Sequence, residues 1–137
     1  MIRPGEFGRY WLPVILYCGA IFLQSSFPVP AGLPSLPHLD KAVHAVIYGG
    51  LAVLFCRALR RRPAFRDRMG KVGWLSFGAT VLYGLSDELH QSLVPGRSAE
   101  AFDLLADAAG ALVGIWLFAR LHAGRGQKKP GGPGCGD

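Results

Sequence analysis

Apolar residues dominate four long stretches of this chain, and shorter polar segments separate them. The apolar stretches cover residues 10–27, 37–59, 72–93 and 98–121. A helix needs roughly 20 residues to cross the hydrocarbon core of a bilayer; the first stretch approaches this length and the other three exceed it. The connection at residues 28–37 is too rich in proline for a helix or a central strand. The pattern therefore predicts an all-α protein, a four-helix transmembrane bundle.

The two ends of the chain depart from this pattern. We assign residues 1–123 to one membrane domain, and we expect residues 124–137, a basic segment rich in glycine and proline, to be a disordered tail. Pro13 is expected in the first turn of a helix, where its missing N–H costs nothing. The first apolar stretch also resembles the apolar region of a signal peptide, but no typical cleavage site follows it.

Positive charge is concentrated between the second and third apolar stretches. The whole chain has a formal net charge of +6. Many of its basic residues fall in this short connection or directly before it: Arg57, Arg60, Arg61, Arg62, Arg66, Arg68 and Lys71. The connection is poor in the aromatic residues that stack on single-stranded nucleic acid, whereas cytoplasmic loops of membrane proteins are enriched in Lys and Arg. We therefore predict no nucleic-acid partner, membrane lipids as partners, and both termini in the cytoplasm.

Polar residues recur at helical spacing in the second stretch. Asp40, His44 and Tyr48 are four residues apart, so they share one helix face. Residues 83–107 add many ionisable groups around a predicted turn at Pro95–Gly96. In the predicted topology all these groups lie toward the outer leaflet. Charge at membrane depth is expensive, so this concentration of charge indicates a polar functional site.

The fourth stretch combines acidic and small residues on one face. Asp103, Asp107, Gly110 and Gly114 fall on a single stripe of a helix. The two glycines have the G-x-x-x-G spacing that lets a second helix approach closely. This stripe is therefore predicted to face the inside of the bundle, and Ser98 is expected to cap the start of the helix.

The polar residues divide into two candidate groups. The candidate catalytic residues are His44, Glu88 and Asp103, and the candidate substrate-binding residues are Asp40, Lys41, Tyr48, Gln91, Arg97 and Asp107. In one hypothesis, Arg97 and Lys41 hold an anionic head group while the carboxylates and His44 act on it. A second hypothesis is a divalent metal bound by Asp40, His44, Glu88 and Asp103. In a third, the charged groups pair only to hold the helices together. The spacing matches no dedicated metal motif, so no cofactor is assigned.

Two motifs resemble those of a known family. The first is D-K-x-x-H-x-x-x-Y, beginning at Asp40, and the second is S-D-E-L-H-Q-S-L-V-P-G-R-S-A-E-A-F-D-L-L-A-D-A-A-G, beginning at Ser86. Together, at this joint spacing, they resemble the VanZ-like family of small bacterial membrane proteins. The family pattern falls on Asp40, His44, Tyr48, Glu88, Gln91, Arg97, Asp103 and Gly110. The family usually has an asparagine where this chain has Asp107.

The resemblance implies a helical membrane domain in the bacterial cytoplasmic (inner) membrane and a role in the cell envelope. The founding members of the family are associated with low-level resistance to the glycopeptide teicoplanin. We expect an outward-facing site that acts on or binds an anionic, lipid-linked or cell-wall-related envelope molecule. The alternative is a non-catalytic interaction module that stabilises an envelope enzyme complex. The sequence does not decide between an enzyme and a binding protein, and it does not define the oligomeric state.

Overall fold

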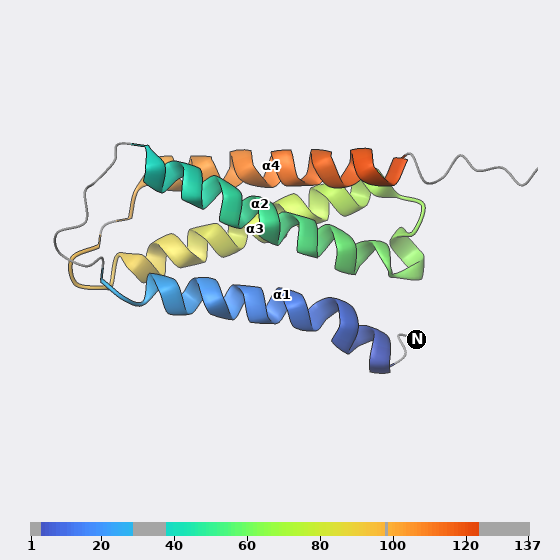
Figure 1. Cartoon of the computed structure of the whole chain (residues 1–137), viewed down its shortest axis with the longest axis horizontal. Helices are drawn as coiled ribbons and strands as arrows, with labels where there is room; N and C mark the ends of the chain where they lie inside the picture. The colour runs from blue at the N-terminus through green and yellow to red at the C-terminus, as the bar shows by residue number, and fades with distance from the viewer. Residues whose placement is uncertain (1–3, 29–37, 98, 124–137) are drawn as a thin grey trace, which may run out of the picture.

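The computed structural model describes residues 4–28, 38–97 and 99–123, and within them the chain forms four α-helices and one short 3-10 helix (Figure 1). The elements are α1 (Pro4–Ser25), α2 (Leu39–Arg60), η1 (Pro63–Phe65), α3 (Met69–Gln91) and α4 (Ala101–Ala123). These described residues include no strand, which confirms the predicted all-α fold class. The predictions for the proline-rich loop at 29–37, the Ser98 cap and the tail at 124–137 concern residues outside the described ranges.

The helix ends differ from the predicted ones by a few residues. The α1 helix begins six residues before the first apolar stretch, so Pro13 lies inside it and the prediction of a first-turn proline is wrong. Apolar patterning marks the membrane-facing part of a helix, whereas the backbone hydrogen bonds continue into its polar ends. After α3, the amide of Arg97 bonds to the carbonyl of Val94 at 3.1 Å. Gly96 has a φ of 82° in this predicted turn, a conformation that favours glycine.

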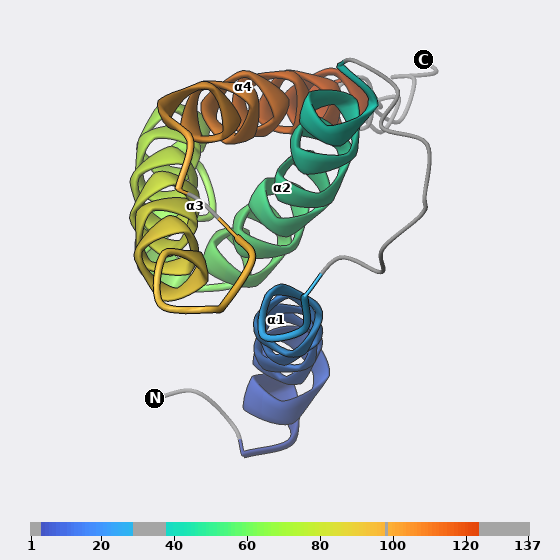
Figure 2. The same cartoon turned by 90° about the vertical axis from the view of Figure 1, so that its left-hand side faces the viewer.

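Helices α2, α3 and α4 form the centre of the bundle, and α1 lies outside them (Figure 2). The most extensive packing is between α2 and α4, while α1 packs mainly on α2 and to a smaller extent on α3. Hydrogen bonds also hold α1 in place. The Tyr17 hydroxyl donates to the Ile47 carbonyl at 3.0 Å, and the Tyr83 hydroxyl donates to the Cys18 carbonyl at 2.6 Å. The orientation of α1 is therefore determined by specific bonds as well as by apolar contact.

Three glycines allow the close approach of α2 and α4. A Cβ on Gly49 would lie 2.9 Å from the carbonyl oxygen of Gly110. A Cβ on Gly110 would overlap the backbone of Ala45, and one on Gly114 would overlap the backbone of Gly49. The predicted inward-facing G-x-x-x-G stripe is thus confirmed at this contact. The same contact places the acidic residues one and two turns earlier on α4 against the polar face of α2.

We expect Gly114→Leu to destabilise the protein strongly. Its side chain meets backbone rather than a flexible neighbour, so the overpacking should cost about 3 kcal/mol or more. Gly78→Ala is the matched control, because a Cβ there meets nothing within 4 Å. That change should stabilise α3 by up to about 1 kcal/mol. Thermal unfolding in detergent measures the effects of both substitutions. Equal melting temperatures for Gly114→Leu and wild type would contradict the close packing of α2 against α4.

The outer surface of the bundle is strongly apolar. Large side chains such as Val46 and Trp74 are each 75% exposed, and α1 exposes Leu16 and Phe22 in the same way. Both α2 and α4 are long and apolar enough to cross a membrane, with a mean hydropathy of 1.7. Exposed apolar surface of this extent is typical of an interaction with lipid or protein rather than with water.

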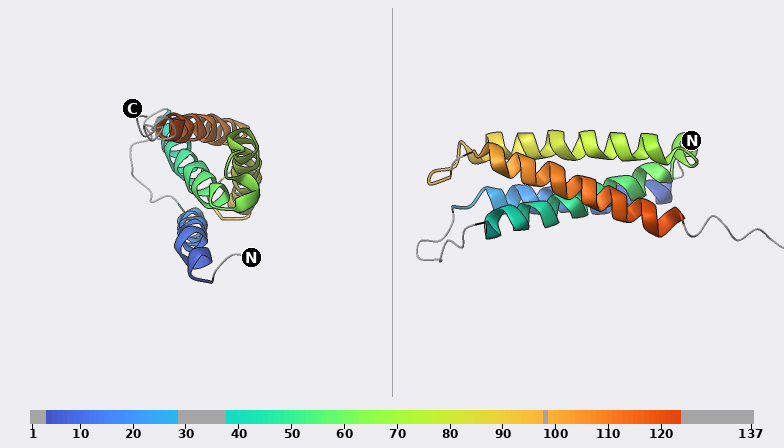
Figure 3. Two further views of the ribbon diagram at one scale, coloured as in Figure 1. Left: turned by 90° about the vertical axis from the view of Figure 1, so that its right-hand side faces the viewer. Right: turned by 90° about the horizontal axis from the view of Figure 1, so that it is seen from above.

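The two ends of the bundle are chemically different. The described start of α1, the described end of α4 and the segment around η1 lie at one end, which we call the basic end (Figures 1 and 3). This end carries the arginines of residues 57–68. The other end holds the α3–α4 connection and the acidic residues beside it, and we call it the polar end.

Candidate functional site

A cavity of about 210 Å³ opens at the polar end, and all four α-helices contribute to its wall. The polar residues that line it are Gln24, Asp40, His44, Tyr48, Asp87, Gln91, Arg97, Glu100 and Asp103. Apolar side chains of α1 and α2, among them Ile21 and Val43, complete the wall. We refer to this space as the polar cavity. The prediction that Asp40, His44 and Tyr48 share a face is confirmed, since all three line it.

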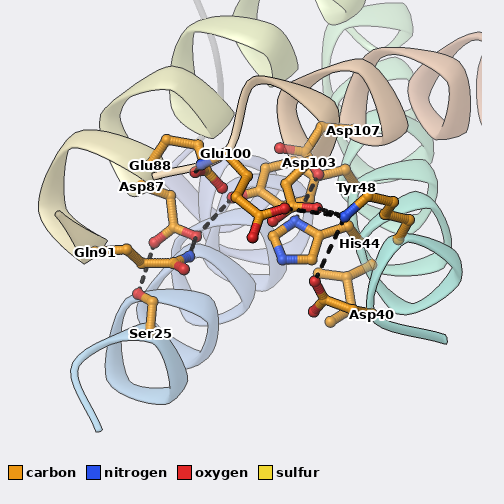
Figure 4. A network of polar contacts seen from close by, with 12 residues as sticks. Ser25, Asp40, His44, Tyr48, Asp87, Glu88, Gln91, Glu100, Asp103 and Asp107 are labelled. Carbon is orange, nitrogen blue, oxygen red and sulfur yellow. Dashed lines mark hydrogen bonds and ion pairs between the residues drawn. The ribbon is translucent and has the colours of Figure 1, made fainter. Parts of the chain in front are cut away.

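Asp87 is the centre of the hydrogen bonds on one side of the polar cavity (Figure 4). Its carboxylate is 5% exposed. It accepts hydrogen bonds from the Ser25 hydroxyl at 2.6 Å, the Tyr48 hydroxyl at 3.0 Å and the Gln91 amide at 3.0 Å. Three donors satisfy a buried carboxylate well and join α1, α2 and α3. Asp87 thus has a positioning role that could not be predicted from the sequence, which indicated Glu88 beside it as the candidate residue.

The hydrogen bonds that Asp87 accepts from Ser25, Tyr48 and Gln91, which we call the Asp87 network, also position Arg97 through Gln91. Because the Gln91 amide nitrogen donates to Asp87, its oxygen faces away and accepts a hydrogen bond from Arg97 Nη1 at 3.0 Å. Arg97 Nε is buried and has no hydrogen-bond partner among the described residues. A guanidinium held at one nitrogen, with another donor free, is suited to binding an anion. The predicted binding residues Gln91 and Arg97 are thus parts of one unit.

Lys41 connects α2 to the start of α4. Its ammonium group lies 3.1 Å from Asp103 Oδ1 and 3.2 Å from Glu100 Oε2. Asp40 is farther away, at 3.9 Å, and its side chain is 64% exposed. The contact with Asp103 is the most buried of these ion pairs, so it contributes more to the fixed geometry than the exposed ones.

His44 and Asp107 are paired in the interior. His44 Nδ1 and Asp107 Oδ1 are hydrogen bonded at 3.0 Å, and the Asp107 side chain is fully buried. The ring of Tyr48 stacks on the His44 ring with an interplanar angle of 10°. A Cβ on Gly84 would lie 2.8 Å from Asp107 Oδ2, so the missing side chain of Gly84 makes room for this carboxylate. An amide oxygen could accept the same bond from His44, which fits the asparagine expected here from the family resemblance.

Glu88 connects α3 to the start of α4. Its Oε2 accepts the backbone N–H of Glu100 at 2.9 Å, directly before α4 begins. A carboxylate at this position satisfies a free N–H and is favourable near a helix N-terminus. Its second oxygen, Oε1, is buried without a hydrogen-bond partner among the described residues.

The structure brings the three candidate catalytic residues together. One ligand atom each from His44, Glu88 and Asp103 lies within 4.8 Å of the other two. Asp40, which the metal hypothesis included, lies outside this group. The six candidates that line the polar cavity are Asp40, His44, Tyr48, Gln91, Arg97 and Asp103. The other three each contact a residue of the cavity wall: Lys41, Glu88 and Asp107.

Comparison with known proteins identifies one family. A family model described as VanZ/LLP1 matches residues 8–122, which cover all four helices except the first residues of α1 and the last residue of α4. No curated protein and no solved structure matches this chain.

Proposed function

The chain belongs to the VanZ/LLP1 family, and we propose that its polar cavity binds an anionic molecule of the bacterial cell envelope. Family membership and the two apolar helices indicate a membrane protein. We further propose that all four helices span the inner membrane, with both termini in the cytoplasm. The positive-inside rule supports this orientation, because the arginine-rich segment lies at the basic end. The polar cavity would then open toward the outer face.

One observation carries the proposal: Arg97 lines the polar cavity, and its buried Nε has no hydrogen-bond partner among the described residues. Guanidinium groups bind phosphate and carboxylate through parallel hydrogen bonds. An apolar outer surface beside the cavity suits a ligand with a lipid tail. The ligand class that fits both features is a lipid-linked or cell-wall-related anion.

The neighbouring His44, Glu88 and Asp103 supply the groups for acting on such a ligand. His44, oriented by Asp107 at 3.0 Å, is suited to proton transfer, as are the two carboxylates. A link to teicoplanin resistance rests on the family resemblance alone. The alternative function is a non-catalytic module that stabilises an envelope enzyme complex. The saturated Asp87 network favours that alternative, because it serves structure rather than ligand binding.

Calorimetric titration tests the proposed function. We expect purified protein in mild detergent to bind a short-chain polyprenyl phosphate saturably. A polyprenol of the same length, without the phosphate, is the control and should bind at least about tenfold more weakly, which corresponds to about 1.4 kcal/mol. Equal binding of both lipids would contradict recognition of the anion, and would favour the structural alternative.

A further inference from the structure

Acidic side chains outnumber basic ones around the polar cavity, which disfavours the binding of an anionic ligand. Six carboxylates line the cavity or contact its wall: Asp40, Asp87, Glu88, Glu100, Asp103 and Asp107. The fixed cations there are Lys41 and Arg97. With every acid ionised and His44 neutral, six negative and two positive charges leave a formal charge of −4. An excess of negative charge disfavours an anion, and it is relieved by protonation of the acids or by bound positive charge.

Three of these side chains have an arrangement that suits a divalent cation. His44 comes from α2, Glu88 from α3 and Asp103 from α4, and Figure 4 shows them converging at the polar end. Their ligand atoms lie within 4.8 Å of one another. Ligand bonds of about 2.0–2.2 Å place the donor atoms of one ion roughly 3–4 Å apart. Small side-chain rotations therefore suffice to bring all three onto one ion.

The free oxygen of Glu88 is a separate observation that points to a ligand. Glu88 is 5% exposed, and its Oε1 has no hydrogen-bond partner among the described residues. Leaving a buried carboxylate oxygen unpaired is costly, and a proton or a bound cation removes that cost. The contact between Lys41 and Asp103 uses only Oδ1 of that carboxylate, so Oδ2 remains for an ion.

We infer that His44, Glu88 and Asp103 form a binding site for a divalent transition-metal cation. One imidazole and two carboxylates are a donor set that Mn²⁺ and Zn²⁺ accept. Asp107 is hydrogen bonded to His44 and would orient the imidazole. The role of the ion rests on the proposed function: it would offset the negative charge of the polar cavity and attract the anionic ligand beside Arg97. With the ion bound, His44, Glu88 and Asp103 would be its ligands rather than proton donors or acceptors.

Electron paramagnetic resonance with Mn²⁺ tests the site on full-length protein that has been stripped of metal, without any lipid ligand. We expect wild type to bind Mn²⁺ saturably. Glu88→Gln keeps the size of the side chain and removes its charge. Its Kd should rise at least about tenfold, since even the loss of a group that only supports a ligand costs about 10–100-fold. Asp67→Asn is the matched control, an exposed acid at the basic end, and should leave the Kd unchanged. Lys41→Gln removes a competing charge and should bind Mn²⁺ at least as tightly as wild type.

Two results would overturn the inference: no saturable Mn²⁺ binding by wild type, or an unchanged Kd in Glu88→Gln. Circular dichroism establishes that the variant is folded. If the variant is not folded, Asp103→Asn is measured in its place, with the same expected loss of Mn²⁺ binding.

The metal site and the proposed function can fail separately. Mn²⁺ binding without polyprenyl phosphate binding would support the metal site and contradict the proposed function. Polyprenyl phosphate binding that persists in the presence of a chelator, together with no Mn²⁺ binding, would contradict the metal site and leave the proposed function in place.

Discussion

Replacing Asp87 with alanine should destabilise the protein more than any other single change at the polar end. The substitution leaves the Ser25 hydroxyl, the Tyr48 hydroxyl and the Gln91 amide without their shared acceptor. Each buried group that loses its partner costs about 1–3 kcal/mol. Because the three donors come from α1, α2 and α3, the loss also weakens the attachment of α1. We expect a decrease of about 3–5 kcal/mol in the free energy of unfolding, comparable to breaking a buried ion pair.

Thermal unfolding in detergent measures this effect, which should appear as a melting temperature lowered by roughly 10 °C or more. Tyr48→Phe removes one of the three bonds and should cost about 1 kcal/mol. Asp67→Ala removes an exposed acid at the basic end and should change stability by no more than about 0.5 kcal/mol. A melting temperature of Asp87→Ala equal to that of wild type would show that the Asp87 network does not hold the helices together.

Arg97→Lys should weaken ligand binding strongly and leave the fold intact. Lysine keeps the positive charge but loses the planar fork, which bonds to Gln91 through Nη1 and includes the unpartnered Nε. Glu88→Gln keeps the size and the acceptor for the Glu100 amide, but removes a charged ligand from the inferred cation site with His44 and Asp103, and the cation is what would attract the anion. For both variants we expect binding of polyprenyl phosphate to weaken at least tenfold, about 1.4 kcal/mol.

Binding and stability must be measured on the same samples to separate a ligand site from structural ion pairs. Arg66→Lys is the matched control, since Arg66 is an exposed arginine at the basic end, and it should bind like wild type. If the charged groups serve only to hold the helices together, binding in Arg97→Lys and Glu88→Gln will fall in proportion to their loss of stability. Variants that are as stable and bind as tightly as wild type would remove both explanations.

The number and approximate position of the helices could be predicted because they depend on local patterns. Apolar runs of sufficient length specify helices in a membrane, and the turn at Pro95–Gly96 follows from two residues with restricted or unusual backbone conformations. The shared face of Asp40, His44 and Tyr48 follows from helical spacing alone. The start of α1 at Pro4 was not predictable in this way, because its first turns carry little apolar pattern.

The partners within the site depend on how the helices are rotated against one another. Ser25 and Asp87 are 62 residues apart in sequence, and no spacing rule connects them. The rotation of α4 against α2 is set by Gly49, Gly110 and Gly114, which explains why Asp107 meets His44. The sequence identified these glycines as a contact surface, but not the helix that they contact. It therefore predicted which residues are polar and face inward, and only the structure shows which of them are bonded.

Mass spectrometry of the lipids that co-purify with the protein tests the central claim most directly. Wild type and Arg97→Lys are purified side by side in mild detergent and their bound lipids are identified. The account predicts that wild type retains a phosphate- or carboxylate-bearing envelope lipid, enriched over the bulk anionic phospholipids, and that Arg97→Lys loses it. Bound lipids that match the bulk membrane, in the same amounts for both proteins, would contradict a ligand site at the polar cavity.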